Sequence, residues 1–271
     1  MNSFYTETWT FSAWIYPDLQ TLGVGEKSYL YTVYLNDQGG TSYYNEIYLE
    51  RLSNNKGRLW LKVPNRDGDY GEWYYDLDSS SHEWTHISIA FDGTDPSCPS
   101  MFYINGVEVI DIAQAAFTGT PMTTRSTDQV YVYDYDGQNN TSSDKNFIGG
   151  FDETVFHNKV LKQADITKIY NSGKSYDHLS RTAPSGLVAW WRFGDERDFQ
   201  GDTYSQQDST TDGGRIIDRT GNGYSLEVEN YYGQMYTTTA IGITSFDEKK
   251  IQYRTIIEAI TFPSASEIIG V

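Results

Sequence analysis

A loop of carboxylate and amide side chains stands out in the sequence as a place where a metal ion could bind. The stretch "YDYDGQNNTSSD" carries oxygen ligands of the kind that Ca²⁺ prefers, at Asp134, Asp136, Asn139, Asn140 and Asp144. Asp134 and Asp136 are two residues apart, so they point to the same side of an extended chain. The three later residues are spaced to close the coordination. The pattern favours a calcium site, and the alternative is a hydrated acidic loop.

Aromatic side chains are a second group that could bind a ligand. They make up 15% of the chain and include 23 tyrosines. Tyrosine and tryptophan offer large contact surfaces at little cost in conformational entropy. A sugar-binding rim is one interpretation, and packing on a sheet face or at a protein interface are the others. The residues concerned are Tyr43, Tyr44, Trp73, Tyr74, Tyr133 and Tyr135.

Charge and cysteine content restrict the partners and the compartment. The formal net charge is -17, so nucleic acid and anionic membrane surfaces repel the chain at long range. No apolar run is long enough to predict a membrane helix. The single cysteine, Cys98, excludes an intrachain disulfide and favours folding in a reducing compartment. The start "MNSFYTETWTFSAWIYP" lacks the features of a signal peptide, so we expect synthesis in the cytosol.

The elements that must position these residues are mainly β-strands. In residues 8–17, "TWTFSAWIYP", apolar side chains alternate with small polar ones, which is the pattern of a half-buried strand. Similar runs recur along the chain, and Asn105-Gly106 predicts a tight hairpin turn. Short strands at this density with a single helix predict an all-β fold, a jelly-roll sandwich of two antiparallel sheets.

One helix is predicted, in "LKQADITKIYNSG". Ile166, Ile169 and Tyr170 share a face there, and Gly173 occupies the position of a left-handed C-cap. Further along, "LVAWWRFGD" predicts an intensely apolar strand, and "RIIDRTGNGYSLEVEN" predicts two strands around a Gly-Asn-Gly turn. The last stretch, residues 236–271, has strand-like pieces without a core pattern, and we interpret it as an arm.

Four stretches resemble, in order and spacing, the laminin G-like and pentraxin-type jelly rolls of the concanavalin A-like lectin/glucanase superfamily. They are "WTFSAWIYP", "EWTHISIAFDG", "MFYINGVEV" and "FIGGFDETVFHNKVLKQADITKIYNSG". The resemblance covers roughly residues 4–173 and implies a concanavalin A-like sandwich with His86 in its scaffold. The acidic loop before "FIGG" lies where pentraxin-like relatives keep calcium ligands, so the resemblance adds to the calcium hypothesis.

The order of the C-terminal strands departs from this family. A segment of the type "LVAYWRFDE" usually precedes the first strand in such proteins, whereas its counterpart here follows the helix. We expect a circularly permuted domain in which residues 187–193 form a core strand of the same sandwich as residues 9–15. A second domain cut short and a strand that docks into a neighbouring subunit are the alternatives. The expected jelly roll covers 1–235, with a main part over 1–176 and completing strands in 183–235, followed by the arm over 236–271.

Laminarinase-type glycanases share this architecture, so enzymatic activity has to be considered. They place two catalytic carboxylates on one strand in an E-x-D-x-x-E pattern. The nearest candidate, "NEIYLERL", has Glu46 and Glu50 on one face but Tyr48 in place of the middle aspartate. Asp152 and Glu153 are expected on opposite faces of a strand, where they cannot converge on one bond. We therefore expect a protein without enzymatic activity.

A virion would explain how an extracellular type of fold lacks an export signal, because virions assemble in the cytosol and leave by lysis. The segment "LVAWWRFGD" after the helix resembles jelly-roll modules of bacteriophage virion proteins. The first hypothesis is a virion surface protein, either a capsid decoration or a tail-fibre module. It would form a homo-oligomer, attach to other virion proteins through its C-terminal arm, and bind glycans. The second is a calcium-dependent carbohydrate-binding lectin module of a bacterial protein.

Overall fold

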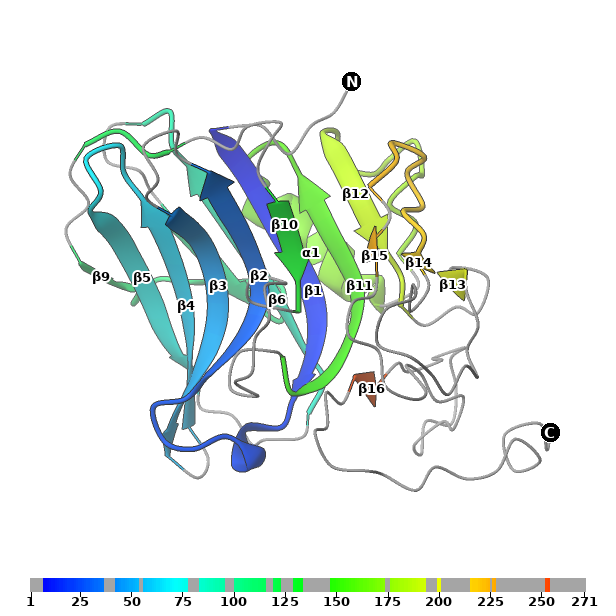
Figure 1. Ribbon diagram of the computed structural model, residues 1–271. Coiled ribbons are helices and arrows are strands. Elements are labelled where there is room, and N and C mark those ends of the chain that lie inside the picture. Colours follow the sequence, from blue (N-terminus) through cyan, green and yellow to red (C-terminus); the bar gives the residue numbers. More distant parts are fainter. Residues whose placement is uncertain are drawn as a thin grey trace.

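The computed structural model describes residues 7–36, 42–53, 56–77, 83–95, 100–115, 119–122, 129–133, 147–173, 176–193, 199–200, 215–224, 226–227 and 252–253. These residues form two large antiparallel sheets that face each other, with a helix behind one of them (Figure 1). The all-β sandwich predicted from the sequence is thus confirmed. Among the described residues, no helix has the length and hydrophobicity needed to cross a membrane.

The first sheet has seven strands, and their order across the sheet differs from their order along the chain. Strand β1 lies between β11 and β6, in the order β12-β11-β1-β6-β7-β8, and β16 pairs with the start of β11. The strands are β1 (Thr8–Pro17), β6 (Thr85–Asp92), β7 (Ser100–Ile104), β8 (Val107–Val109), β11 (Gly149–His157), β12 (Leu187–Trp191) and β16 (Gln252–Tyr253). A short 3-10 helix, η1 (Leu19–Thr21), follows β1.

The second sheet has six strands in the order β10-β2-β3-β4-β5-β9. Its middle strands follow one another along the chain, and β3 pairs antiparallel with β4. The strands are β2 (Lys27–Asn36), β3 (Ser42–Ser53), β4 (Lys56–Pro64), β5 (Tyr70–Leu77), β9 (Ala113–Ala115) and β10 (Gln129–Val132). This sheet therefore presents four long neighbouring strands, β2 to β5, side by side (Figure 1).

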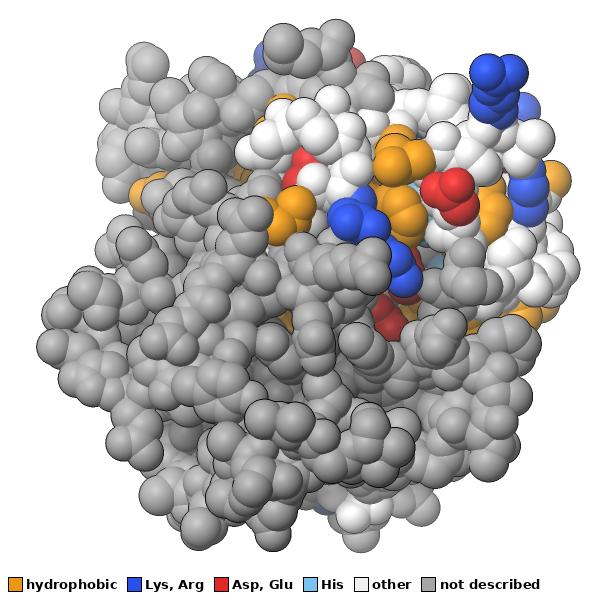
Figure 2. All heavy atoms as spheres, turned by 90° about the vertical axis from the view of Figure 1, so that its right-hand side faces the viewer, with side chains coloured by type: hydrophobic (Ala, Val, Ile, Leu, Met, Phe, Trp, Pro, Cys, Tyr) orange, Lys and Arg blue, Asp and Glu red, His pale blue; other side chains and the backbone are white. Residues whose placement is uncertain are grey.

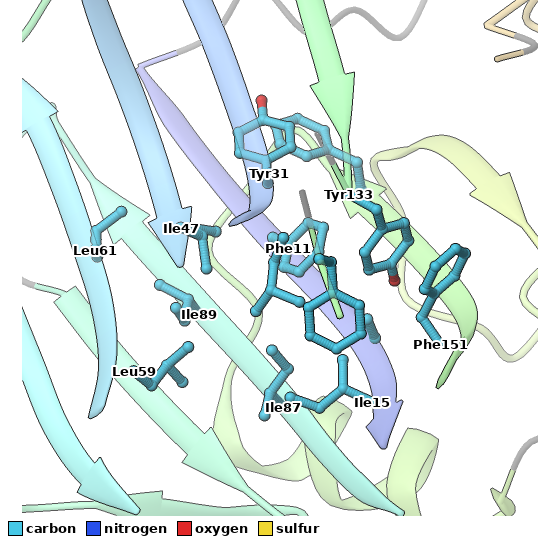
Figure 3. Close-up of a cluster of buried hydrophobic side chains, with 14 of the residues drawn as sticks. Phe11, Ile15, Tyr31, Ile47, Leu59, Leu61, Ile87, Ile89, Tyr133 and Phe151 are labelled. Carbon is cyan, nitrogen blue, oxygen red and sulfur yellow. The ribbon is translucent and has the colours of Figure 1, made fainter. Parts of the chain in front are cut away.

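Apolar side chains from the two inner faces fill the space between the sheets (Figure 3). Phe11 and Ile15 of β1 point inward, as the alternation in residues 8–17 predicts, and lie in one cluster with Ile47 of β3 and Leu61 of β4. All four are fully buried. Burial of each such side chain stabilises the fold by about 1.5–3 kcal/mol. The apolar side chains that point inward from both sheets therefore hold the two layers together.

Strand β12 confirms the predicted place of residues 187–193. It pairs antiparallel with β11, which in turn pairs with β1. Val188, Trp191 and Phe193 are buried in the main core. The strand that usually precedes β1 in this kind of fold therefore completes the sandwich from a later position in the same chain.

The other C-terminal strands are only partly as expected. Strands β13 (Phe199–Gln200), β14 (Arg215–Ile216) and β15 (Leu226–Glu227) form a small sheet of their own instead of extending either large sheet. Strand β16, which lies in the stretch interpreted as an arm, pairs with β11. A strand of two residues is too short to show an alternating pattern, so the sequence could not predict this pairing.

Helix α1 (Gln163–Asn171) covers part of the outer face of the first sheet. Its buried residues Ile166 and Ile169 pack in one cluster with Ala90 of β6 and Tyr103 of β7. Gly173 follows the helix with a φ of 63°, the left-handed conformation expected of a C-cap glycine. The predicted helix and its apolar face are confirmed.

A hydrogen-bonded group of polar side chains lies on the same outer face. The Nε2 atom of His86 is 2.9 Å from the Ser12 hydroxyl, and the Ser88 hydroxyl donates to Ser12 at 2.8 Å. All three residues are buried, and the His86 ring contacts Trp14 and Tyr170. His86 therefore belongs to the scaffold, as its resemblance to the family strand implies.

Candidate functional site

The outer face of the six-stranded sheet carries aromatic and charged side chains on each of its four long strands. These side chains point outward because successive residues of a strand point to opposite faces of the sheet. In β3, Ile47 and Leu49 point into the core, so the residues between and beside them point outward. The same alternation applies to the neighbouring strands. The outer face of β2 to β5 consists of Lys27, Tyr29, Tyr34, Tyr44, Glu46, Tyr48, Glu50, Arg58, Trp60, Lys62, Tyr70, Glu72, Tyr74 and Asp76.

Four aromatic rings form a continuous row across these strands. Tyr29, Tyr48, Trp60 and Tyr74 lie opposite one another in the register of β2 to β5. Their ring centroids are 5.2, 5.9 and 4.6 Å apart in that order, within the range of favourable aromatic pairs. Tyr29 and Tyr48 are buried, whereas Trp60 and Tyr74 are half-buried. We call these four residues the aromatic ladder.

Carboxylates and a lysine line one side of the aromatic ladder. Glu46, Lys62 and Glu72 lie opposite one another on β3, β4 and β5. The Lys62 Nζ atom is 3.8 Å from the Glu46 carboxylate. Glu46 is nearly buried, while Glu72 is half-buried. This side of the ladder therefore combines one ion pair with a further carboxylate.

A second charged row lines the other side of the aromatic ladder. Lys27, Glu50, Arg58 and Asp76 lie opposite one another from β2 to β5. The Arg58 guanidinium donates to both oxygens of Asp76, at 2.5 and 3.1 Å. Glu50 accepts a hydrogen bond of 2.7 Å from the Trp60 indole. The carboxylate of Glu50 thus fixes the orientation of the half-buried ring of Trp60.

Tyr48 lies at the centre of the outer face and is only 3% exposed. Burial raises the pKa of its hydroxyl, and the carboxylates of Glu46, Glu72 and Glu50 raise it further because they disfavour a phenolate. The Lys27 ammonium lies 4.5 Å from the centre of the ring. The hydroxyl has no hydrogen-bond partner among the described residues. It therefore stays protonated and can bond to a ligand.

This combination of groups is suited to a sugar. The face of an aromatic ring carries partial negative charge, which attracts the C–H bonds on one side of a pyranose ring. Carboxylates accept hydrogen bonds from sugar hydroxyls, and charged acceptors give stronger bonds than neutral ones. On the outer face, carboxylates of β3 and β5 lie on both sides of the row of rings. The arrangement offers stacking and hydrogen bonding to the same ligand.

The aromatic residues predicted as a sugar-binding rim are divided by the structure. Tyr74 belongs to the aromatic ladder. Tyr44 lies on the same outer face, opposite Tyr34, with ring centroids 5.5 Å apart. Tyr43 packs partly against the core, and its ring centroid is 6.5 Å from that of Tyr70. The structure thus brings Tyr44 and Tyr74 to one face.

The prediction is wrong for Trp73 and Tyr133. Trp73 is 2% exposed and packs inside the sandwich, because it alternates with Tyr74 along β5. Tyr133 has a positive φ of 63°, lies in the core and contacts Phe151, and its hydroxyl hydrogen-bonds to Thr154. Neither ring is available to a ligand. Tyr135 lies outside the described residues.

Sequence reasoning missed Tyr29, Tyr48 and Trp60. The alternation of Tyr48 with Ile47 and Leu49 is visible in the sequence and predicts that Tyr48 points outward. The ladder itself depends on the register between strands, which places Tyr48 opposite both Tyr29 and Trp60. The sequence of one strand does not determine which residues of the neighbouring strand lie opposite it, so the ladder could not be predicted.

The predicted calcium site cannot be placed, because Asp134, Asp136, Asn139, Asn140 and Asp144 all lie outside the described residues. Within the described part of the chain, no group of three or more His, Cys, Asp or Glu side chains is arranged to bind a metal ion. The calcium site in the 134–144 loop stays a prediction.

The carboxylates considered for catalysis have other partners. Glu46 and Glu50 share the outer face of β3, as predicted, and Tyr48 lies between them. On β11, a bulge interrupts the strict alternation expected of Asp152 and Glu153, and Glu153 takes a φ of 46°. Trp190 and Arg192 donate to its carboxylate at 2.6 and 3.1 Å. Acidic and basic side chains lie close together on the side of the molecule where β12 lies (Figure 2).

A family model described as the concanavalin A-like lectin/glucanases superfamily matches residues 1–167. With the two-sheet sandwich and the outer face already described, the match defines the class of protein. The chain belongs to the concanavalin A-like lectin/glucanases superfamily. No curated protein matches it.

Three solved structures illustrate the similarity of fold. A candidate carbohydrate-binding protein from Bacteroides ovatus is 12% identical with a TM-score of 0.50, over 83% of this chain and 54% of that one. A heptameric SAP-like pentraxin from Limulus polyphemus is 12% identical with a TM-score of 0.45, over 64% and 74%. The enzymatically active domain of tailspike protein 2 from bacteriophage CBA120 is 17% identical with a TM-score of 0.45, over 69% and 27%. At these identities the similarity concerns the fold alone.

Proposed function

We propose that this protein binds glycans on the outer face of the six-stranded sheet and has no enzymatic activity. The aromatic ladder carries this proposal. The half-buried rings of Trp60 and Tyr74 continue the row begun by Tyr48, and carboxylates line the row on both sides. The rings would stack on sugar faces while the carboxylates accept sugar hydroxyls. Membership of a lectin and glucanase superfamily supports the same class of ligand.

The positions of Glu46 and Glu50 support a binding role rather than catalysis. Glycoside hydrolysis needs two carboxyl groups that flank one bond at about 5–9.5 Å from each other. On β3 the ring of Tyr48 lies between Glu46 and Glu50, where the glycanase pattern has an aspartate. Each carboxylate is also held by its own partner on β4, Glu46 by Lys62 and Glu50 by Trp60.

We further propose that the protein is displayed on a bacteriophage virion as a homo-oligomer, in a capsid decoration or a tail fibre. This part of the proposal rests on the resemblance of "LVAWWRFGD", whose first five residues form β12, to jelly-roll modules of virion proteins. Other virion proteins would bind residues 236–271, of which Gln252 and Tyr253 pair with β11 in the same chain. Calcium in the 134–144 loop would be a cofactor.

A glycan array tests the proposed function, with two variants probed beside the wild type. The double variant Trp60→Ala/Tyr74→Ala removes the exposed part of the aromatic ladder. The control Ile110→Ala alters a residue that is 87% exposed just beyond β8, in the other sheet. We expect a restricted set of glycans to bind the wild type and the control but not the double variant. Repeating the array with a chelator tests the proposed role of calcium in glycan binding. Loss of binding would support that role, and unchanged binding would contradict it.

A reducing-end assay on the bound glycans tests the absence of catalysis. Incubation with the protein should release no new reducing ends over a day. Steady release that disappears in Glu50→Gln would show a glycosidase and overturn the proposal. An array without any bound glycan would overturn the glycan-binding function itself.

A further inference from the structure

Two asparagine–glycine pairs occur in the chain, Asn105-Gly106 and Asn222-Gly223, and in both the glycine has a positive φ. An asparagine before glycine can modify itself without an enzyme, because glycine has no Cβ to hinder the approach of its nitrogen to the preceding side chain. The glycine nitrogen gives up its proton and bonds to Cγ of the asparagine, the side-chain amide leaves as ammonia, and a cyclic succinimide remains. Addition of water opens this ring to aspartate or isoaspartate.

The Asn105-Gly106 turn is held by contacts with two other elements. The Asn105 side-chain oxygen accepts a hydrogen bond of 2.9 Å from the backbone N–H of His86 in β6. The Gly106 carbonyl accepts hydrogen bonds from two side chains of helix α1. On the same helix, the Tyr170 ring lies 2.7 Å from the position that a Cβ on Gly106 would take. Closing the succinimide ring moves the backbone of the turn, so these contacts must first be broken.

The Asn222-Gly223 turn is open to solvent. Both residues are exposed. Apart from its chain neighbours, no heavy atom of the described residues lies within 4 Å of the position that a Cβ on Gly223 would take. The backbone of this turn can therefore change its conformation without pushing against another part of the described structure.

The side-chain hydrogen bond of Asn222 can be released at little cost. The Asn222 amide donates to the Val188 carbonyl of β12 at 2.9 Å. The Thr220 hydroxyl donates to the same carbonyl at 3.2 Å, so the carbonyl keeps a partner when the amide turns away. The exposed amide then bonds to water instead, and a bond that water replaces contributes little to stability. The Asn222 side chain is thus free to turn toward the Gly223 nitrogen.

We infer that Asn222 is a site of spontaneous deamidation in the folded protein, whereas Asn105 is protected. The product adds a negative charge and, as isoaspartate, lengthens the backbone of the turn by a carbon atom. The new carboxylate is an acceptor where the amide donated to the Val188 carbonyl. It also repels the buried Asp218 carboxylate, which accepts hydrogen bonds from the backbone of the same turn. Deamidation therefore weakens the contact of this turn with β12, whether or not the protein binds a glycan.

Peptide mapping by mass spectrometry tests the inference on the full chain during incubation at pH 8. One sample stays folded, and the other is unfolded in guanidinium chloride. In the folded sample we expect Asn222 to convert at least about tenfold faster than Asn105, because Asn105 reacts only when its turn opens locally. In the unfolded sample the two rates should agree within about twofold, because both asparagines then precede an unrestrained glycine.

Two variants connect the modification to the stability of the protein. Asn222→Gln keeps the amide but cannot form the five-membered ring, so its urea midpoint should stay constant during the incubation while that of the wild type falls. Asn171→Gln makes the same change at an exposed asparagine at the end of α1 and should age like the wild type.

Three results would overturn the inference. Equal rates at Asn222 and Asn105 in the folded sample would show that the surroundings of the two turns do not decide the reaction. An Asn222 that stays intact in the folded sample, while it converts in the unfolded one, would show that the fold protects it. A urea midpoint that stays constant in fully deamidated wild type would contradict the weakened contact with β12.

Discussion

Acidification from pH 7 to pH 5 should destabilise this protein by at least about 2 kcal/mol, because three buried histidines are neutral in the folded state. His86, His157 and His178 are each at most 4% exposed. The Nδ1 atoms of all three, and Nε2 of His157, have no hydrogen-bond partner among the residues that the structure describes. His178 contacts both the His157 ring and Trp190 of β12, at 6.2 and 5.2 Å between centroids. The group lies where the segment after β11 covers the first sheet.

The magnitude follows from the pKa of each ring. Burial lowers the pKa of His86 from 6.5 to about 3, and burial together with the nearby Lys159 lowers that of His157 from 6.5 to about 3. The unfolded chain therefore binds protons more readily, and stability is lost as the pH falls from about 6.5 toward 3. Between pH 7 and pH 5 each of these two histidines costs about 2 kcal/mol. Burial also lowers the pKa of His178, so this ring acts in the same direction.

Glu153 acts in the opposite direction. Burial and the neighbouring Asp152 raise its pKa from 4.5 to about 8. Its contribution to stability is present at low pH and is lost as the pH rises from about 4.5 to 8. Acidification to pH 5 therefore recovers about 2 kcal/mol from this group. The net loss of about 2 kcal/mol from His86, His157 and Glu153, to which His178 adds, is a large part of the 5–15 kcal/mol by which folded proteins are usually stable.

Urea denaturation at pH 7 and pH 5, followed by tryptophan fluorescence, measures this difference. The variant His157→Phe replaces a ring that has no hydrogen bond, so it should fold and should reduce the pH dependence by about 2 kcal/mol. An exposed-residue control, Leu179→Ala, should keep the full dependence. Equal pH dependence in wild type and His157→Phe would refute the reasoning, since the buried ring would then not be the titrating group.

Three further changes test the fold by the same denaturation. Asp218→Asn should cost about 1–3 kcal/mol, because this buried carboxylate accepts hydrogen bonds from the backbone N–H groups of Trp190, Thr220 and Tyr224; a loss below 0.5 kcal/mol would make it dispensable. Gly106→Ala should cost about 1–3 kcal/mol, since φ is 75° and a Cβ would lie 2.7 Å from the Tyr170 ring; an unchanged midpoint would contradict that geometry. Trp191→Ala should cost about 3–5 kcal/mol, and a mild effect would argue against β12 as a core strand.

Alternation along single strands predicted much of the fold. The inward positions of β1 follow from residues 8–17, and the apolar density of residues 187–193 predicted a core strand before its partner was known. Helix α1 followed from Ile166 and Ile169 together with the glycine after it. In each case a local periodicity or a turn residue predicts the element, and burial of its apolar face stabilises it.

The candidate site was predicted only in part, for reasons that lie in register and local geometry. Tyr74 and Trp73 are neighbours in "GEWYYD", but only the buried Leu77 at the end of β5 shows which of them points outward. Tyr133 turns into the core through a positive φ that a tyrosine rarely adopts. The aromatic ladder needs the alignment of four strands, and the sequence of one strand does not contain it.

Titration of the preferred array glycan into the wild type and into Trp60→Ala/Tyr74→Ala, by calorimetry at pH 7, tests the central claim that the outer face of the six-stranded sheet is the glycan site. Both residues are half-buried, so the double variant should keep its urea midpoint within a modest shift. We predict that the affinity of the double variant for the glycan falls at least tenfold, while Ile110→Ala binds it like the wild type. Undiminished affinity in a folded double variant would contradict the claim and place the ligand elsewhere on the molecule.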